Sequence, residues 1–126
     1  MDNMLSAWVT NLKRAFDFSG RTSRASFWWT TLTSIIFGFT FFIGGGLFYH
    51  SILGTLFQSL YWIYVLVWFI PGLSMGIRRL HDIGRSGWWI LFSFIPIIGT
   101  IVLIVWQATK GNYGDNVYGA PVTMPK

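Results

Sequence analysis

The sequence predicts an all-α integral membrane protein, a helical bundle with about three membrane segments and an amphipathic interfacial helix at the N-terminus. Two long stretches, 25–77 and 86–109, contain no Asp, Glu, Lys or Arg. Only 10% of the 126 residues are charged, against about 25% in soluble domains, so the chain lacks the polar shell that a small soluble fold needs. Aromatic residues make up 20%, with eight Trp, and Trp gathers where hydrocarbon meets water. The whole chain is therefore predicted to form a single membrane domain.

Residues 1–18 are predicted to form the interfacial helix. Leu5, Trp8 and Leu12 belong to a set of apolar residues that recur every three or four positions, whereas Lys13 and Arg14 fall mostly on the other side. A helix with this pattern lies in the plane of the lipid headgroups. A frayed terminus is the alternative.

Three membrane segments are predicted, at 26–49, 56–77 and 88–107, followed by an irregular tail at 108–126. A span needs about 20 apolar residues, so the first charge-free stretch holds two spans joined by a turn near His50. Thr22 or Ser23 is expected to cap the first span. The glycines at 44–46 indicate either a close helix contact or a soft helix end.

The third segment has two possible forms. Pro96 and Gly99 interrupt it at mid-depth. The expected form is one kinked span, which is how such residues are usually tolerated in membranes. The alternative is a re-entrant hairpin, and the choice decides on which side of the membrane the C-terminus lies.

The basic residues predict the orientation. Seven Lys and Arg residues lie within 13–24 and 78–85, whereas the loop between the first two spans has none. Because basic loops stay on the cytoplasmic side, the N-terminus is predicted to be cytoplasmic in a multi-pass protein of the bacterial cytoplasmic (inner) membrane.

The polar stretch 78–87 is the candidate site. If the second helix continues past Ile77, Arg78, Asp82 and Arg85 share one face, and Arg79 lies three residues from Asp82. Guanidinium groups suit phosphate oxygens, so five arginines are predicted to bind an anionic lipid headgroup or another phosphate, with His81 and Asp82 as orienting or ion-pairing residues. These arginines are Arg21, Arg24, Arg78, Arg79 and Arg85. A basic rim that only fixes topology explains much of the same pattern.

Other functional classes fit the sequence less well. His81 and Asp82 are neighbours on a helix and point about 100° apart, so no catalytic residues are predicted and the protein is not expected to be an enzyme. There are no Cys, and the other histidine, His50, is expected at the opposite interface, so no metal site or cofactor is predicted. The net charge of +5 flanks apolar stretches, which favours anionic lipids over nucleic acid as partners.

Gly72 and Gly76 form a small-xxx-small pattern that lets helices pack closely. The pattern indicates packing within the chain, between copies as a homo-oligomer, or against a membrane protein partner. A subunit of a small oligomeric channel or transporter is accordingly the alternative function, and a non-catalytic binding module is the expected one.

Several motifs together resemble the YhaH/YhaI-like family of small bacterial inner-membrane proteins, a domain of unknown function (DUF805). They are Phe18-x-Gly20-Arg21-x-x-Arg24-x-x-Phe27-Trp28, the block from Arg78 to Trp89, Pro96 with Gly99, and Asn116-x-Tyr118-Gly119 with Pro121. The resemblance implies a bacterial inner-membrane location and a helical fold. It implies no particular activity.

Overall fold

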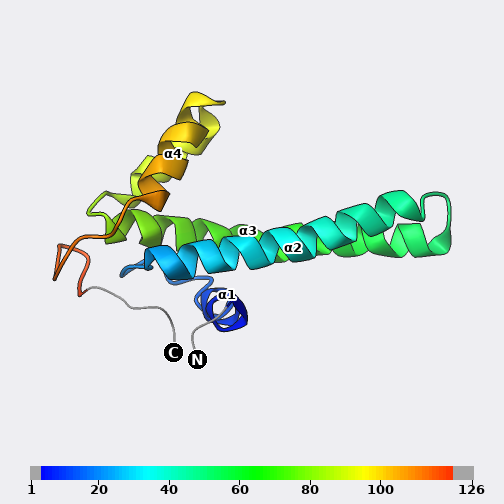
Figure 1. The fold of residues 1–126 in the computed structure, drawn as a ribbon, viewed down its shortest axis with the longest axis horizontal. Helices are drawn as coiled ribbons and strands as arrows, with labels where there is room; N and C mark the ends of the chain where they lie inside the picture. The colour runs from blue at the N-terminus through cyan, green and yellow to red at the C-terminus, as the bar shows by residue number, and fades with distance from the viewer. Residues whose placement is uncertain (1–3, 121–126) are drawn as a thin grey trace.

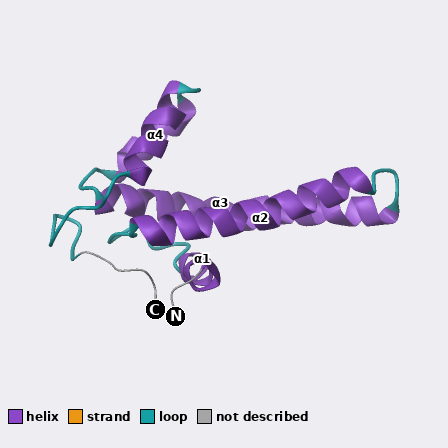
Figure 2. Ribbon diagram, viewed as in Figure 1, coloured by secondary structure: helices purple, strands orange, loops and turns teal. Residues whose placement is uncertain are grey.

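A computed structural model describes residues 4–120, and the regular elements in that range are helices (Figure 2). They are α1 (Met4–Lys13), α2 (Arg24–Leu47), α3 (Ile52–Asp82), the 3₁₀ helix η1 (Gly87–Phe94) and α4 (Ile98–Ala108). α2 and α3 run side by side as one long hairpin, with α1 on one side of its base and α4 on the other (Figure 1). The predicted all-α class is confirmed.

The ends of the long helices follow from local capping. The Ser23 side chain accepts a hydrogen bond from the Ser26 amide, and Ser51 accepts one from Gly54, so each fills an N-cap position. Between the two helices, His50 has a φ of 68°, and a Cβ at Gly54 would collide with the Phe48 carbonyl oxygen. The turn is therefore tight and covers residues 48–51, so α3 begins at Ile52, four residues before the predicted start of the second span.

α2 and α3 are long and apolar enough to cross a membrane. At 24 and 31 residues, they measure about 36 Å and 46 Å at about 1.5 Å per residue. Only 22% of the most apolar part of each helix is buried within the chain. Most of their apolar side chains thus face outward, unlike those of a core helix in a soluble protein.

The base of the hairpin has a polar interior. Among the described residues, the buried hydrophobic side chains are Ala7, Phe27, Met75, Leu80 and Leu103. The buried polar and charged ones form a longer set, comprising Asn11, Arg21, Thr22, Ser26, Thr30, Thr33, Ser74, Arg78, Arg79, His81, Asp82 and Gln107. Hydrogen bonds between these groups, rather than an apolar core, therefore position the elements at this end.

α1 packs against the hairpin through a polar contact. Its Asn11 side chain donates hydrogen bonds to Thr30 Oγ1 at 2.7 Å and Ser26 Oγ at 3.1 Å on α2. The Trp8 ring lies 5.2 Å from that of Trp68 on α3. α1 ends at Lys13, earlier than the sequence predicted, and residues 1–3 of the predicted helix lie outside the described range.

The third predicted segment reverses direction instead of continuing as one kinked span. η1 and α4 pack against each other, and the Trp89 ring of η1 lies 5.5 Å from the Trp106 ring near the end of α4. The turn forms because Ile97 adopts a φ of 66° and Gly99 approaches the Phe92 carbonyl oxygen more closely than a Cβ would allow. α4 has 11 residues, about 16 Å, which is too short to cross a core of about 30 Å. The expectation of a kinked span is wrong, and the alternative hairpin describes the shape.

Glycines allow the helices to approach at specific points. A Cβ at Gly44 would lie 2.7 Å from the Phe57 ring, and one at Gly76 would lie 3.0 Å from Ile90. A Cβ at Gly72 or Gly46 would meet nothing within 4 Å. Gly44 thus lies in close contact with α3, and Gly76 lies in close contact with η1, whereas Gly72 has no close neighbour in the described chain.

Alanine substitution at two neighbouring glycines tests this packing. Gly44→Ala forces the Phe57 ring to move and is expected to destabilise the helix pair by about 1–3 kcal/mol. Gly46→Ala meets open space and is expected to be neutral or to stabilise by about 0.5–1 kcal/mol. Unfolding in mild detergent, followed by circular dichroism, measures both, and equal effects would contradict the packing assigned to α2 and α3.

Candidate functional site

Three arginines and one aspartate form a buried arginine cluster at the base of the hairpin. Arg21 precedes α2, while Arg78, Arg79 and Asp82 occupy the last turns of α3. The arginines are 0–1% exposed and Asp82 is 5% exposed. Groups buried this deeply need partners for nearly every donor and acceptor.

Asp82 joins Arg21 to Arg79. Its Oδ1 accepts a hydrogen bond from Arg21 Nε at 2.9 Å, and its Oδ2 accepts one from Arg79 Nη1 at 2.8 Å. The predicted pairing of Arg79 with Asp82 is confirmed. The expected shared face is not formed, because α3 ends at Asp82 and Arg85 lies beyond it. Arg78 bonds to other groups, and Arg21, 61 residues earlier in the chain, takes the second place on the carboxylate.

Arg21 binds the C-terminal tail to the cluster. Its two terminal nitrogens donate to the carbonyl oxygens of Asn112 at 2.8 Å, Gly114 at 2.9 Å and Gly119 at 3.2 Å. A fourth carbonyl, that of Asp82 itself, accepts at 3.3 Å. Together with the bond to the Asp82 carboxylate, Arg21 makes five hydrogen bonds. A guanidinium has five N–H donors, so Arg21 has no free donor.

Arg79 caps the end of α4. Its Nε donates to the Gln107 carbonyl at 3.0 Å, and its Nη2 bonds to the Thr109 carbonyl. The last carbonyls of a helix have no partner within the helix, and they carry partial negative charge that attracts cations. Arg79 therefore joins the C-terminus of α4 to α3.

Arg78 binds the carbonyl groups at and just after the C-terminus of α1. It donates to the carbonyls of Arg14 at 3.0 Å and Asp17 at 2.5 Å, and to the Asn11 side chain at 2.7 Å. Its Nε donates to Thr22 Oγ1 at 2.9 Å. These contacts hold α1 and the turn before α2 against α3.

His81 faces away from the Asp82 carboxylate. Its Nδ1 lies 2.9 Å from the Gly20 carbonyl oxygen, and its ring stacks on Tyr118 at 3.9 Å between centroids. His81 and Asp82 therefore have different partners, and His81 contacts a backbone carbonyl and a ring instead of the ion-pair partner that the sequence predicted. Tyr118 and Asn116, whose side chain donates to the His81 carbonyl at 3.0 Å, fix the tail on this side.

The remaining predicted arginines lie nearer the surface. Arg24 is exposed and donates to the Ala108 carbonyl at 3.3 Å, while the Arg85 guanidinium lies 4.0 Å above the Trp106 ring. Arg24 and Lys110 line a shallow cavity of about 240 Å³ at the N-terminus of α2. The Arg21 and Asp82 pair also lines it. Of the five predicted arginines, the structure thus gathers three in the interior and leaves two outside.

The exposed part of this end contains smaller charge pairs. Burial is the largest single influence on the Asp17 carboxyl and raises its pKa, but hydrogen bonds from Arg14 and Ser19 together with the charge of Arg14 outweigh burial and lower the pKa of Asp17 to about 2. Lys110 donates to the Tyr113 hydroxyl at 2.6 Å, which lowers the pKa of that phenol. Both pairs are local and solvated.

Sequence reasoning missed the partners of the cluster. Gly111 lies against Asp82 so closely that a Cβ there would collide with the carboxylate, and the tail carbonyls give no sequence signal at all. Asn11 was not among the predicted site residues either, although it is only 1% exposed and accepts a hydrogen bond from Arg78. Lys110, which lines the cavity beside Arg24, was not among the predicted site residues.

Removing the shared carboxylate tests the cluster. Asp82→Ala leaves two buried guanidiniums without a counter-charge and is expected to cost about 3–5 kcal/mol of stability. Asp17→Ala breaks a half-exposed pair with Arg14 and is expected to cost less than about 1 kcal/mol. Denaturant unfolding in mild detergent compares them, and a small effect at Asp82 would refute its structural role.

Comparison with known proteins places the chain in a family. A family described as "Protein of unknown function (DUF805)" matches residues 15–120. Inner membrane protein YhaI of Escherichia coli (strain K12) is 40% identical over 112 residues, which cover 89% of this chain and 91% of YhaI. Inner membrane protein YhaH of the same strain is 34% identical over 119 residues, covering 86% and 88%. No solved structure gives a significant match. This chain, an all-helical protein with two apolar helices long enough to cross a membrane, belongs to the DUF805 family.

Proposed function

We propose that this protein is a non-catalytic module of the inner membrane that binds anionic lipid headgroups through Arg24 and Lys110. The observation that carries the proposal is the placement of these two exposed cations around one cavity, beside a cluster whose own guanidiniums are already bonded within the chain. The donors of the cluster arginines are directed to backbone carbonyls, to Asp82 and to the side chains of Asn11 and Thr22, so their role is to hold the cavity in shape.

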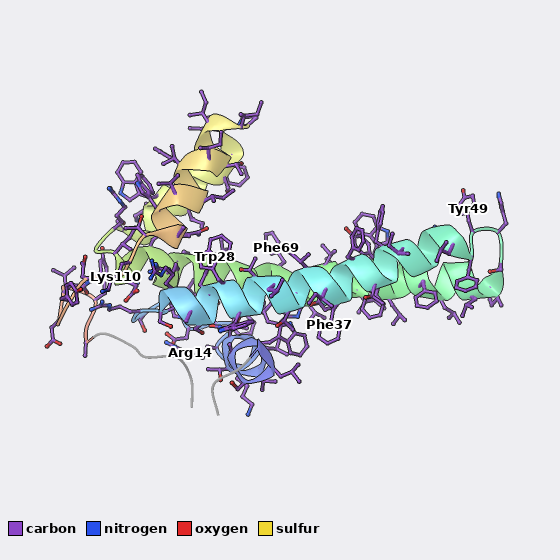
Figure 3. All side chains as sticks on the ribbon, viewed as in Figure 1. Arg14, Trp28, Phe37, Tyr49, Phe69 and Lys110 are labelled. Carbon is purple, nitrogen blue, oxygen red and sulfur yellow. The ribbon has the colours of Figure 1, made fainter. Side chains whose placement is uncertain are left out.

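The distribution of charge supports an orientation with this end in the cytoplasm. Eight Lys and Arg residues and three Asp residues of the described chain lie within 13–24, 78–85 and 110–115. Hydrogen bonds join these three stretches. Arg14 and Lys110 lie at the opposite end of the hairpin from Tyr49 (Figure 3). The positive-inside rule assigns such an end to the cytoplasm.

Within this orientation α2 and α3 are the two spans. α1 and the turn after it lie at the cytoplasmic interface, where the exposed Leu5 of α1 and Phe16 of the turn contact lipid. η1 with α4 enters the cytoplasmic leaflet and returns. The tail then lies on the same side as the N-terminus.

The cavity suits a phosphate headgroup. Arg24 and Lys110 supply two positive charges, and the first amides of α2 add partial positive charge. Arg21 and Arg79 neutralise the Asp82 carboxylate that also lines the cavity. An anionic headgroup at the membrane surface therefore meets net positive charge.

The position of the C-terminus tests the arrangement of the third segment. Fluorescent and periplasm-active reporters fused to the C-terminus are expected to report a cytoplasmic location, the same side as reporters fused to the N-terminus. A periplasmic C-terminus would contradict the hairpin and restore three spans.

Single charge removals test lipid binding. Arg24→Gln and Lys110→Gln are each expected to lower the amount of phosphatidylglycerol retained per protein by about fivefold, because one basic residue near the surface contributes about 1 kcal/mol. The retained lipid is measured by mass spectrometry after purification in mild detergent.

Lys13→Gln is the matched control, since Lys13 is an exposed residue of α1 outside the cavity. It is expected to lower retention much less than Lys110→Gln. Equal losses from both variants would show attraction by overall charge alone and would refute the cavity as the binding site.

A further inference from the structure

A second site lies on the opposite side of the last turn of α3. A groove of about 700 Å³ runs between α3 and η1. Its apolar walls include Phe69, Leu73 and Ile77 of α3 and Leu91 of η1. No charged side chain is among the described residues that line it, and its polar side chains include His81 and Ser86. Ligand sites typically combine apolar walls with a few polar groups in this way.

His81 offers an unused acceptor to this groove. The Gly20 carbonyl can only accept, so Nδ1 carries the proton of the neutral ring and Nε2 is an acceptor. None of the described groups bonds to Nε2, although His81 is only 8% exposed. A Cβ at Gly87, which lines the groove, would lie 3.4 Å from Nε2. Nε2 therefore faces the groove beside Gly87. The neighbouring Ser86 hydroxyl accepts a hydrogen bond from the Trp88 amide, and its own proton remains available for donation to a ligand.

The groove has the polarity gradient of a single lipid in one leaflet. Its polar end lies beside the charged end of the molecule, and its apolar wall follows α3 from Ile77 to Phe69. The rise from Phe69 to His81 is about 18 Å, and one leaflet of hydrocarbon is about 15 Å deep. A charged headgroup would find no counter-charge among the lining side chains and would lose its hydration.

We propose that this groove binds one membrane lipid with an uncharged, hydroxyl-bearing headgroup, of the monoacylglycerol or diacylglycerol class. The lipid hydroxyl donates to His81 Nε2, Ser86 donates to an ester oxygen, and an acyl chain follows α3 toward Phe69. This site is separate from the anionic-lipid cavity at Arg24 and Lys110.

Photolabelling of the full chain in phosphatidylcholine nanodiscs tests the proposal. The probe is a monoacylglycerol with a diazirine in its acyl chain. The corresponding methyl ester and free fatty acid serve as comparisons. The monoacylglycerol is expected to label 69–77 and 87–94, and the two comparison probes to label these peptides about fivefold less. The methyl ester has no hydroxyl to donate to His81 Nε2, and the ionised fatty acid has no proton to donate and brings a charge that meets no counter-charge in the groove. Equal labelling by the fatty acid or the methyl ester would overturn the headgroup assignment.

Variants locate the label. Leu73→Trp fills the groove and is expected to abolish labelling of 87–94, whereas Leu66→Trp, the same change at an exposed position of α3 outside the groove, is expected to preserve it. Ser86→Ala is expected to weaken labelling by the monoacylglycerol severalfold.

Labelling spread evenly over the exposed faces of α2 and α3, and unchanged in Leu73→Trp, would overturn the proposal in favour of bulk lipid. Absent groove labelling together with a change of oligomeric state in Leu73→Trp would overturn it in favour of a second copy. The three probes are compared on the unmodified protein, so this part of the test does not depend on whether any variant folds.

Discussion

Bonds between buried guanidiniums and backbone carbonyls hold the charged end of this molecule together. A helix that ends away from water leaves up to four carbonyls without partners, and hydrocarbon offers none. Arg78 and Arg79 bind the carbonyls at the ends of α1 and α4, and Arg21 binds those of the tail. Burying three guanidiniums with one carboxylate is costly. The partial negative charge of helix C-termini offsets part of that cost, so each arginine and the segment that it binds depend on one another.

The exposed faces of α2 and α3 are more apolar than the interior at the base of the hairpin, and this reversal explains how the other elements are held together. α2 and α3 are long and apolar enough to cross a bilayer, and in a bilayer the hydrophobic effect does not pack helices together, because lipid is as apolar as their side chains. Close contact and polar bonds do so instead. Gly44 against Phe57 brings the helices together near the far end, and Asn11 against Thr30 attaches α1 near the base. The polar bonds are concentrated at the end of the hairpin where the charged side chains lie.

The sequence carried enough information for the helices but not for the partners of the arginines. Charge-free stretches and the cap residue Ser23 predict α2 and α3, because length and capping are local properties. Pro96 and Gly99 are compatible with either a kink or a reversal, and the reversal depends on contacts of η1 with α4 that no local pattern encodes. Because Arg79 carries a guanidinium, the sequence predicts that its N–H groups donate to oxygen acceptors. Whether that oxygen belongs to a phosphate or to a carbonyl depends on where the tail and α4 fold, which only the tertiary structure decides.

The last turn of α3 separates the structural role from the proposed binding roles. Neighbouring residues of a helix point in different directions, so Asp82 faces the cluster while His81 faces the groove. η1 and α4 are held against α3 by Arg79 and by the contact of Gly76 with Ile90, and these contacts set the width of the groove. A change in the cluster is therefore expected to disturb both proposed lipid sites through the fold. A change confined to Ser86 or Lys110 touches one proposed site and leaves the cluster bonds intact, so the two proposed binding roles can be tested separately by mutation even though one set of buried arginines supports both.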